Sequence, residues 1–146
     1  MARRKGSLGR QRTTTCLRRH LFRLTTNHPT PLWWLASYGF TQEVETAVGT
    51  IAANGLPLWQ SYLAGLDPTN PASRLILSLD RRGSDLVLNW STVTGRVYTI
   101  WESTNLPASF VPLSGAVDLP ASIQSLTNPP LHATPATFYR LQVQKP

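Results

Sequence analysis

The sequence predicts a mainly β fold, a small antiparallel β-sandwich that follows a short helical unit and a disordered basic N-terminal tail. From residue 73 onward apolar residues alternate with polar ones, which is the period of half-buried strands. Turn signals with Gly or Pro separate these runs at spacings of about 10 residues, as in small sandwiches. We therefore divide the chain into a tail (1–30), a helical joint (31–72) and a β-sandwich (73–146).

The positive charge of the chain is concentrated in the tail. Residues 1–23 carry eight of the 14 basic side chains and no acid, whereas the remainder carries six basic and seven acidic side chains. We therefore expect a disordered, solvated tail; the alternative is contact with nucleic acid or an anionic membrane, through residues 1–23 alone. The segment is not a recognisable secretion signal, because charges interrupt its apolar residues. The single cysteine, Cys16, excludes a disulfide within the chain, and no apolar run is long enough for a transmembrane segment.

The helical joint begins with two short predicted helices. Thr30 followed by Pro31 is typical of a helix start, with the hydroxyl as N-cap, and Gly39 is placed to end that helix. Residues 41–48 are compatible with a second short helix. Both are too short to be stable alone, so they must pack against other parts of the protein.

A third predicted helix begins at Pro57 and ends at Gly65. Its apolar residues have the spacing of one buried face, and we expect them to hold the joint by packing. They are Leu58, Trp59, Tyr62 and Leu63.

The β-sandwich begins with a predicted hairpin over residues 75–91, which turns at 81–84. Residues 97–103 are rich in β-branched and aromatic side chains, which favours a strand. The other predicted strands cover residues 110–113, 122–126 and 137–143.

No pattern in the sequence indicates catalysis. The three histidines are scattered, without a cysteine or carboxylate at metal-ligand spacing, and no nucleophile motif or phosphate-binding glycine loop occurs. We therefore predict that the protein is not an enzyme. Trp101, on the strand face opposite Tyr98 and Ile100, is the candidate binding residue for a carbohydrate or protein partner; the alternative is a packing role.

Two groups of motifs resemble a module of bacterial secreted and cell-surface proteins. Residues 34–40 and 54–71 look like the part in which a calcium loop of dockerin or thrombospondin type 3 kind leads into a helix and a turn. Residues 88–106 and 138–141 are similar to the C-terminal β-sandwich beside it, which is fibronectin type III-like in outline. The resemblance implies a noncatalytic structural or accessory module of an extracellular or cell-surface protein, whose partners are other domains of a longer exported protein or a surface glycan.

The resemblance also assigns ligand positions to the loop. With Gly55 at position 6 of an EF-hand-type loop, positions 1, 3, 5 and 12 fall on Thr50, Ala52, Asn54 and Ser61. Position 3 then has no ligand oxygen and position 12 lacks its carboxylate, so we expect a vestigial loop and no cofactor, calcium included. Asn54 and Asp67 remain the only candidate metal ligands.

Overall fold

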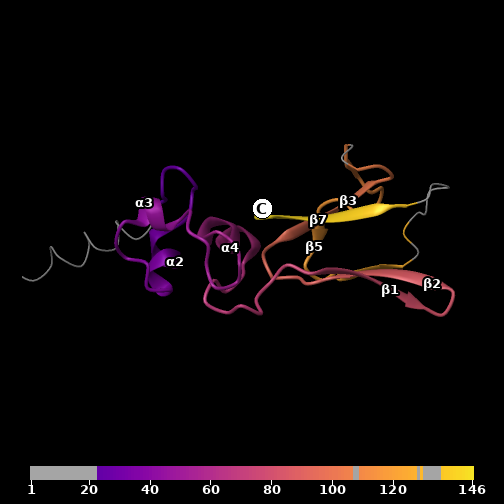
Figure 1. Ribbon diagram of the computed structural model, residues 1–146, viewed down its shortest axis with the longest axis horizontal. Helices are drawn as coiled ribbons and strands as arrows, with labels where there is room; N and C mark the ends of the chain where they lie inside the picture. Colours follow the sequence, from indigo (N-terminus) through magenta and orange to yellow (C-terminus); the bar gives the residue numbers. More distant parts are fainter. Residues whose placement is uncertain (1–22, 107–108, 128, 130–135) are drawn as a thin grey trace, which may run out of the picture.

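The computed structural model describes residues 23–106, 109–127, 129 and 136–146. Most of the predicted tail lies outside these residues, so its contact with nucleic acid or membranes stays a prediction. The described chain first forms three short helices and then two antiparallel sheets. The helices lie toward one end of an elongated molecule and both sheets toward the other (Figure 1).

The helices are α2 (Leu32–Ser37), α3 (Val44–Ala47) and α4 (Leu58–Ala64). The predicted N-cap of α2 is wrong, because the Thr30 hydroxyl donates to the carbonyl of His28 at 2.9 Å and Pro31 occupies the cap position. Helix α3 is shorter than predicted, since Glu43 adopts a left-handed conformation with φ of 45° just before it. Within the described ranges, no helix has the length and apolar character needed to cross a bilayer.

Residues 23–30 pack on the helical unit, although the sequence places them in the tail. The backbone amide of Thr26 donates to both carboxylate oxygens of Glu45, at 2.9 and 3.1 Å. The ring of His28 stacks on Trp59, with centroids 4.8 Å apart and an interplanar angle of 6°. These contacts join the segment to α3 and α4.

Helix α4 ends as predicted at Gly65, which adopts a left-handed conformation with φ of 71°. Its buried face differs from the prediction, because the loop before the helix supplies a polar partner that lets a serine lie inside. Leu63, expected inside, is 36% exposed, and Trp59 and Tyr62 are only partly buried. The buried residues are Leu58, Ser61 and Ala64.

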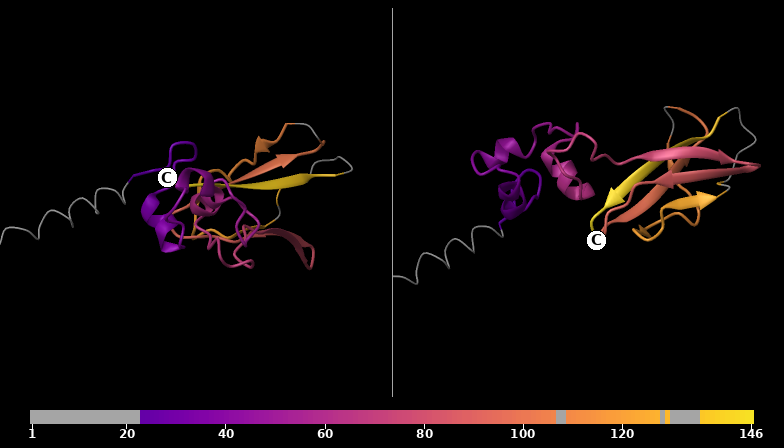
Figure 2. Two further views of the ribbon diagram at one scale, coloured as in Figure 1. Left: turned by 60° about the vertical axis from the view of Figure 1, so that its left-hand side comes forward. Right: turned by 90° about the horizontal axis from the view of Figure 1, so that it is seen from below.

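The first sheet has the order β1 (Leu77–Arg82), β2 (Asp85–Trp90) and β6 (Ser125–Thr127). Strands β1 and β2 form the predicted hairpin, which pairs Leu77 with Trp90 and Leu79 with Leu88. Strand β6 adds to the other edge of β2, and the turned views of Figure 2 show the hairpin reaching away from the helices.

The second sheet is built around β3 (Val97–Ser103). Strands β4 (Val111–Pro112) and β5 (Leu119–Pro120) pair with different parts of β3, while β7 (Phe138–Gln144) pairs along its whole length. Strands β3 and β7 match the predicted strands closely, and β4 and β6 lie within or beside the predicted ones. Strand β5 was missed, because its second residue is a proline that the sequence suggests is a break.

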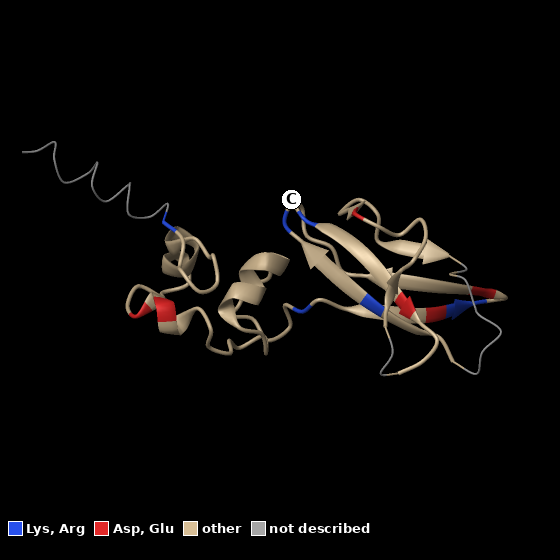
Figure 3. Ribbon diagram, turned by 90° about the horizontal axis from the view of Figure 1, so that it is seen from above, with Lys and Arg blue, Asp and Glu red and all other residues tan. Residues whose placement is uncertain are grey.

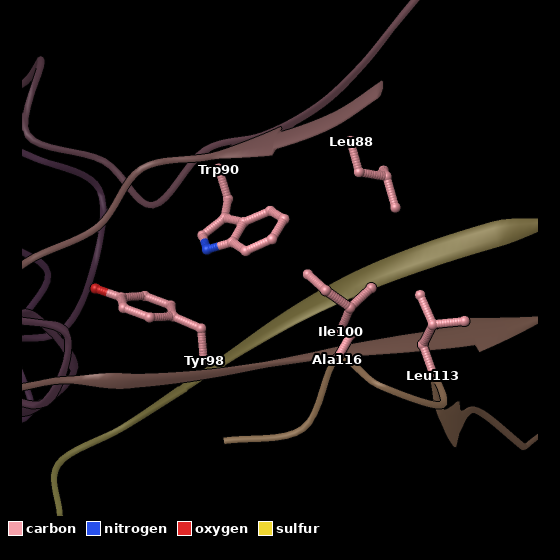
Figure 4. Close-up of a cluster of buried hydrophobic side chains, with 6 residues drawn as sticks. All are labelled: Leu88, Trp90, Tyr98, Ile100, Leu113 and Ala116. Atoms are coloured by element: carbon pink, nitrogen blue, oxygen red, sulfur yellow. The ribbon is translucent and has the colours of Figure 1, made fainter. Parts of the chain in front are cut away.

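The two sheets contribute to one core. Leu88 and Trp90 of β2 point toward Tyr98 and Ile100 of β3, as Figure 4 shows. Leu113 and Ala116, which follow β4, are fully buried in the same cluster. The described chain is therefore mainly β, with two antiparallel sheets and a few short helices.

Helix α4 is fastened to the second sheet by two basic residues. Arg96, just before β3, donates to the carbonyl oxygens of Tyr62, at 2.7 Å, and of Leu63. These carbonyls belong to the last turn of the helix, where the usual partners four residues on are missing; the Tyr62 carbonyl also accepts from the Gly65 amide at 3.1 Å. Lys145, just after β7, donates to the Tyr62 hydroxyl. The contacts connect the helical unit with both long strands of this sheet.

Candidate functional site

The loop before α4 is closed by its own backbone. Ile51 and Pro57 form an isolated antiparallel bridge, and the Ala52 amide donates to the Leu56 carbonyl at 2.9 Å. Gly55 allows the turn, since its φ is 82°. Leu56 would occupy position 7 of a calcium loop, whose carbonyl is a metal ligand. In this chain that carbonyl accepts a backbone hydrogen bond.

The centre of the loop holds a buried pair of side chains. Asn54 is 3% exposed and Ser61 is fully buried. The Asn54 amide nitrogen donates to the Ser61 hydroxyl at 3.0 Å, and that hydroxyl lies 3.3 Å from the Asn54 amide oxygen, to which it can donate. The Asn54 amide oxygen also accepts from the Leu56 backbone amide at 3.1 Å. The residues aligned with ligand positions 5 and 12 are thus bonded to each other.

The residues aligned with positions 1 and 3 serve other purposes. The Thr50 hydroxyl donates to the Ala47 carbonyl at 2.7 Å, which satisfies the end of α3. Ala52 packs against the apolar cluster of the helical unit, which includes Leu35 and Leu58. A carboxylate in place of Ala52 would have to enter that cluster, which is costly for a charged group.

Asp67, the other candidate ligand, stabilises a turn. Its Oδ1 accepts from the Thr69 hydroxyl at 2.7 Å and from the Thr69 amide at 2.9 Å. These two bonds lower the pKa of the Asp67 carboxyl below its ordinary value. The residue contacts the loop through its backbone, whose carbonyl lies 3.4 Å from the Asn54 amide nitrogen. Among the described residues, no group of three or more His, Cys, Asp or Glu could hold a metal ion.

A cleft of about 290 Å³ opens beside the loop. Arg74 lines it, and its Nε donates to the Pro71 carbonyl at 2.8 Å. A guanidinium here opposes the entry of a cation. The residues around the cleft are Asn54, Gly55, Leu56, Arg74 and Leu75.

Trp101, the candidate binding residue, lies on β3 and is partly buried. The guanidinium carbon of Arg140 lies 5.3 Å from the centroid of its ring. The same carbon lies 4.8 Å from the ring centroid of Phe110. Trp101 is therefore part of an aromatic and cationic cluster. A binding role for Trp101 stays a prediction.

The roles of two residues of these sites were not predicted from the sequence. Ser61 was aligned with ligand position 12, but its burial was not predicted. It lies three positions after Leu58, and that helical spacing could have placed it on the buried face. Arg140 lies opposite Trp101 through the register of β3 and β7. No local signal in the sequence reveals that register.

No protein-family model, curated protein or solved structure matches this chain. We therefore infer the function from the loop geometry, the sheet arrangement and the motifs in the sequence.

Proposed function

We propose that the chain is a noncatalytic structural module of an exported or cell-surface bacterial protein. In this proposal the loop at residues 50–61 has the frame of a calcium site but keeps its conformation without the ion. The two sheets form a fibronectin type III-like β-sandwich. The order of the motifs and the core shared by the two sheets support this assignment.

The pairing of Asn54 with Ser61 is the observation that carries the proposal. A calcium ion needs six to eight oxygen ligands, several of them charged. Here the two side chains at the centre of the frame are neutral, buried and hydrogen-bonded to each other. An ion entering the loop would break those bonds and gain no carboxylate at position 12. The pair thus provides the link between loop and helix that an ion would otherwise provide.

A structural role also agrees with how the loop is connected. The loop leads directly into α4, whose last turn is bonded to Arg96 and Lys145 at the two long strands of the second sheet. A loop of constant shape therefore fixes the start of α4, and α4 fixes the helical unit against the sheets.

A calcium titration followed by thermal unfolding tests the proposal. A site with a Kd of about 1 mM would stabilise the protein by about 1.4 kcal/mol at about 10 mM calcium. That corresponds to a rise in Tm of several degrees for a domain of this size. We expect the same Tm in chelator and in calcium, with magnesium as the control for ionic strength.

A rise in Tm with calcium but not with magnesium would overturn the proposal that the loop works without calcium. The variant Asp67→Asn would then show whether Asp67 is the ligand, because its substitution would abolish the rise. The same rise in this variant would place the ion elsewhere.

A further inference from the structure

The outer face of the second sheet carries an arginine held against two aromatic rings. Trp101 pairs with Arg140 on one side and with Pro112 on the other, so the three side chains share one face. This face is opposite the one that contributes Tyr98 and Ile100 to the core. The Arg140 guanidinium lies over both Trp101 and Phe110, as a cation–π interaction requires.

The hydrogen-bond donors of this cluster are unused within the described part of the chain. Arg96 and Arg74 donate to backbone carbonyls, whereas no described residue accepts a hydrogen bond or forms an ion pair with the Arg140 guanidinium. The Trp101 indole nitrogen is buried and also lacks a partner there. Because aromatic contact restrains a guanidinium without using its N–H groups, Arg140 is held in place with its donors free.

The positive charge of Arg140 lies in a part of the chain that has no net positive charge. The chain beyond residue 23 has six basic and seven acidic side chains, so its net charge is close to zero. Figure 3 shows the charged positions scattered along the ribbon. A polyanion such as nucleic acid is held by many cations in a row. An isolated guanidinium instead suits one planar oxyanion, which it can bind with two parallel hydrogen bonds.

We propose that Arg140, Trp101 and Phe110 form a binding site for the carboxylate of an acidic sugar, as found in uronate-containing polysaccharides. The guanidinium binds the carboxylate through two N–H groups, and the exposed parts of the aromatic rings contact the apolar C–H groups of the sugar ring. The site lies on the second sheet and involves no residue of the calcium-free loop.

An NMR titration of the full chain with oligogalacturonate tests the site. We expect shifts of the Trp101 indole and Arg140 guanidinium resonances. Arg140→Gln should weaken binding at least about tenfold, since it removes a charged hydrogen-bonding partner. Arg140→Lys should also weaken binding several-fold, because lysine keeps the charge but loses the planar fork. Retained core resonances would show that both variants are folded.

Arg82→Gln is the matched control, because it removes one positive charge from an exposed position on β1. It should leave binding unchanged, and any contribution of the basic residues 1–23 is the same in all variants. Equal losses in the Arg82 and Arg140 variants would overturn the proposal, and so would the absence of shifts with oligogalacturonate. Binding of a neutral galactose oligomer or a sulfated polysaccharide, but not of oligogalacturonate, would overturn the assignment to a carboxylate.

Discussion

Replacing Asn54 by alanine tests what holds the joint together. The substitution removes the bonds to the Ser61 hydroxyl at 3.0 Å and to the Leu56 amide at 3.1 Å. Each is worth about 1 kcal/mol, and leaving a buried Ser61 hydroxyl with one partner fewer adds to the loss. The contact with Asp67 at 3.4 Å is too long to add much. We expect Asn54→Ala to lower the free energy of unfolding by about 2–3 kcal/mol.

Urea denaturation and thermal unfolding measure this loss. A loss of about 2–3 kcal/mol corresponds to a decrease in Tm of about 10 °C in a domain of this size. Asn70→Ala is the control, because Asn70 is exposed and its side chain accepts one local bond, from the Ala72 amide at 2.9 Å. We expect it to cost less than about 1 kcal/mol. The difference between the two variants measures the combined effect of burial and of the additional hydrogen bond of Asn54.

A double-mutant cycle of Asn54→Ala and Ser61→Ala measures the interaction free energy between these two side chains. If Asn54 acts through Ser61, the two losses should not add, and the coupling should be about 1 kcal/mol. Ser61→Ala also removes the contact of its hydroxyl with the Pro57 carbonyl at 3.3 Å. That loss occurs with Asn54 and with alanine at position 54, so it cancels in the cycle. A loss below about 0.5 kcal/mol for Asn54→Ala, or additive losses in the cycle, would refute the reasoning.

Two further changes test the joint and its turn. Gly65→Ala should lower the free energy of unfolding, measured by urea denaturation, by about 2–3 kcal/mol, because φ is 71° and a Cβ would lie 2.8 Å from Val93 Cγ1. Gly83→Ala is the control: its φ is also positive but the space around it is open, so it should cost about 1 kcal/mol. Equal losses in the two variants would contradict the close approach at Gly65. The pKa of Asp67 is lowered by its bonds to Thr69, so its stabilisation is present above about pH 4 and lost as the pH falls through the lowered pKa. Asp67→Asn should therefore reduce the fall of the urea midpoint between about pH 5 and pH 2, and an unchanged fall would exclude this role.

The sheets were largely predictable, since a strand with one buried face must alternate. The alternation in residues 75–91 located the hairpin, and the β-branched run at 97–103 located β3. The pairing of β3 with β7 could not be predicted, because register depends on turns and packing far apart in sequence. Short pairings such as β5 carry too few residues for any periodic signal.

At the loop and α4, the pattern of apolar residues does not predict which side chains are buried. A pattern of apolar residues assigns Leu63 to the interior and leaves Ser61 unremarked, yet Ser61 is fully buried. Its hydroxyl accepts a hydrogen bond from Asn54, seven residues earlier, and also lies 3.3 Å from the Pro57 carbonyl, so burial leaves it with partners. Glu43 is a similar case, since its left-handed conformation delays the start of α3 to Val44, although local propensity permits a helix from residue 41.

The hydrogen bond between Lys145 and Tyr62 has a mechanical consequence. It joins residues 83 positions apart, so the sheets form an excursion of the chain that both leaves and returns beside α4 (Figure 1). We expect tension between α4 and residue 145 to load the bond between Lys145 and Tyr62 first. Once that bond breaks, the load should fall on the pair Val97 and Gln144, where β7 ends beside the start of β3.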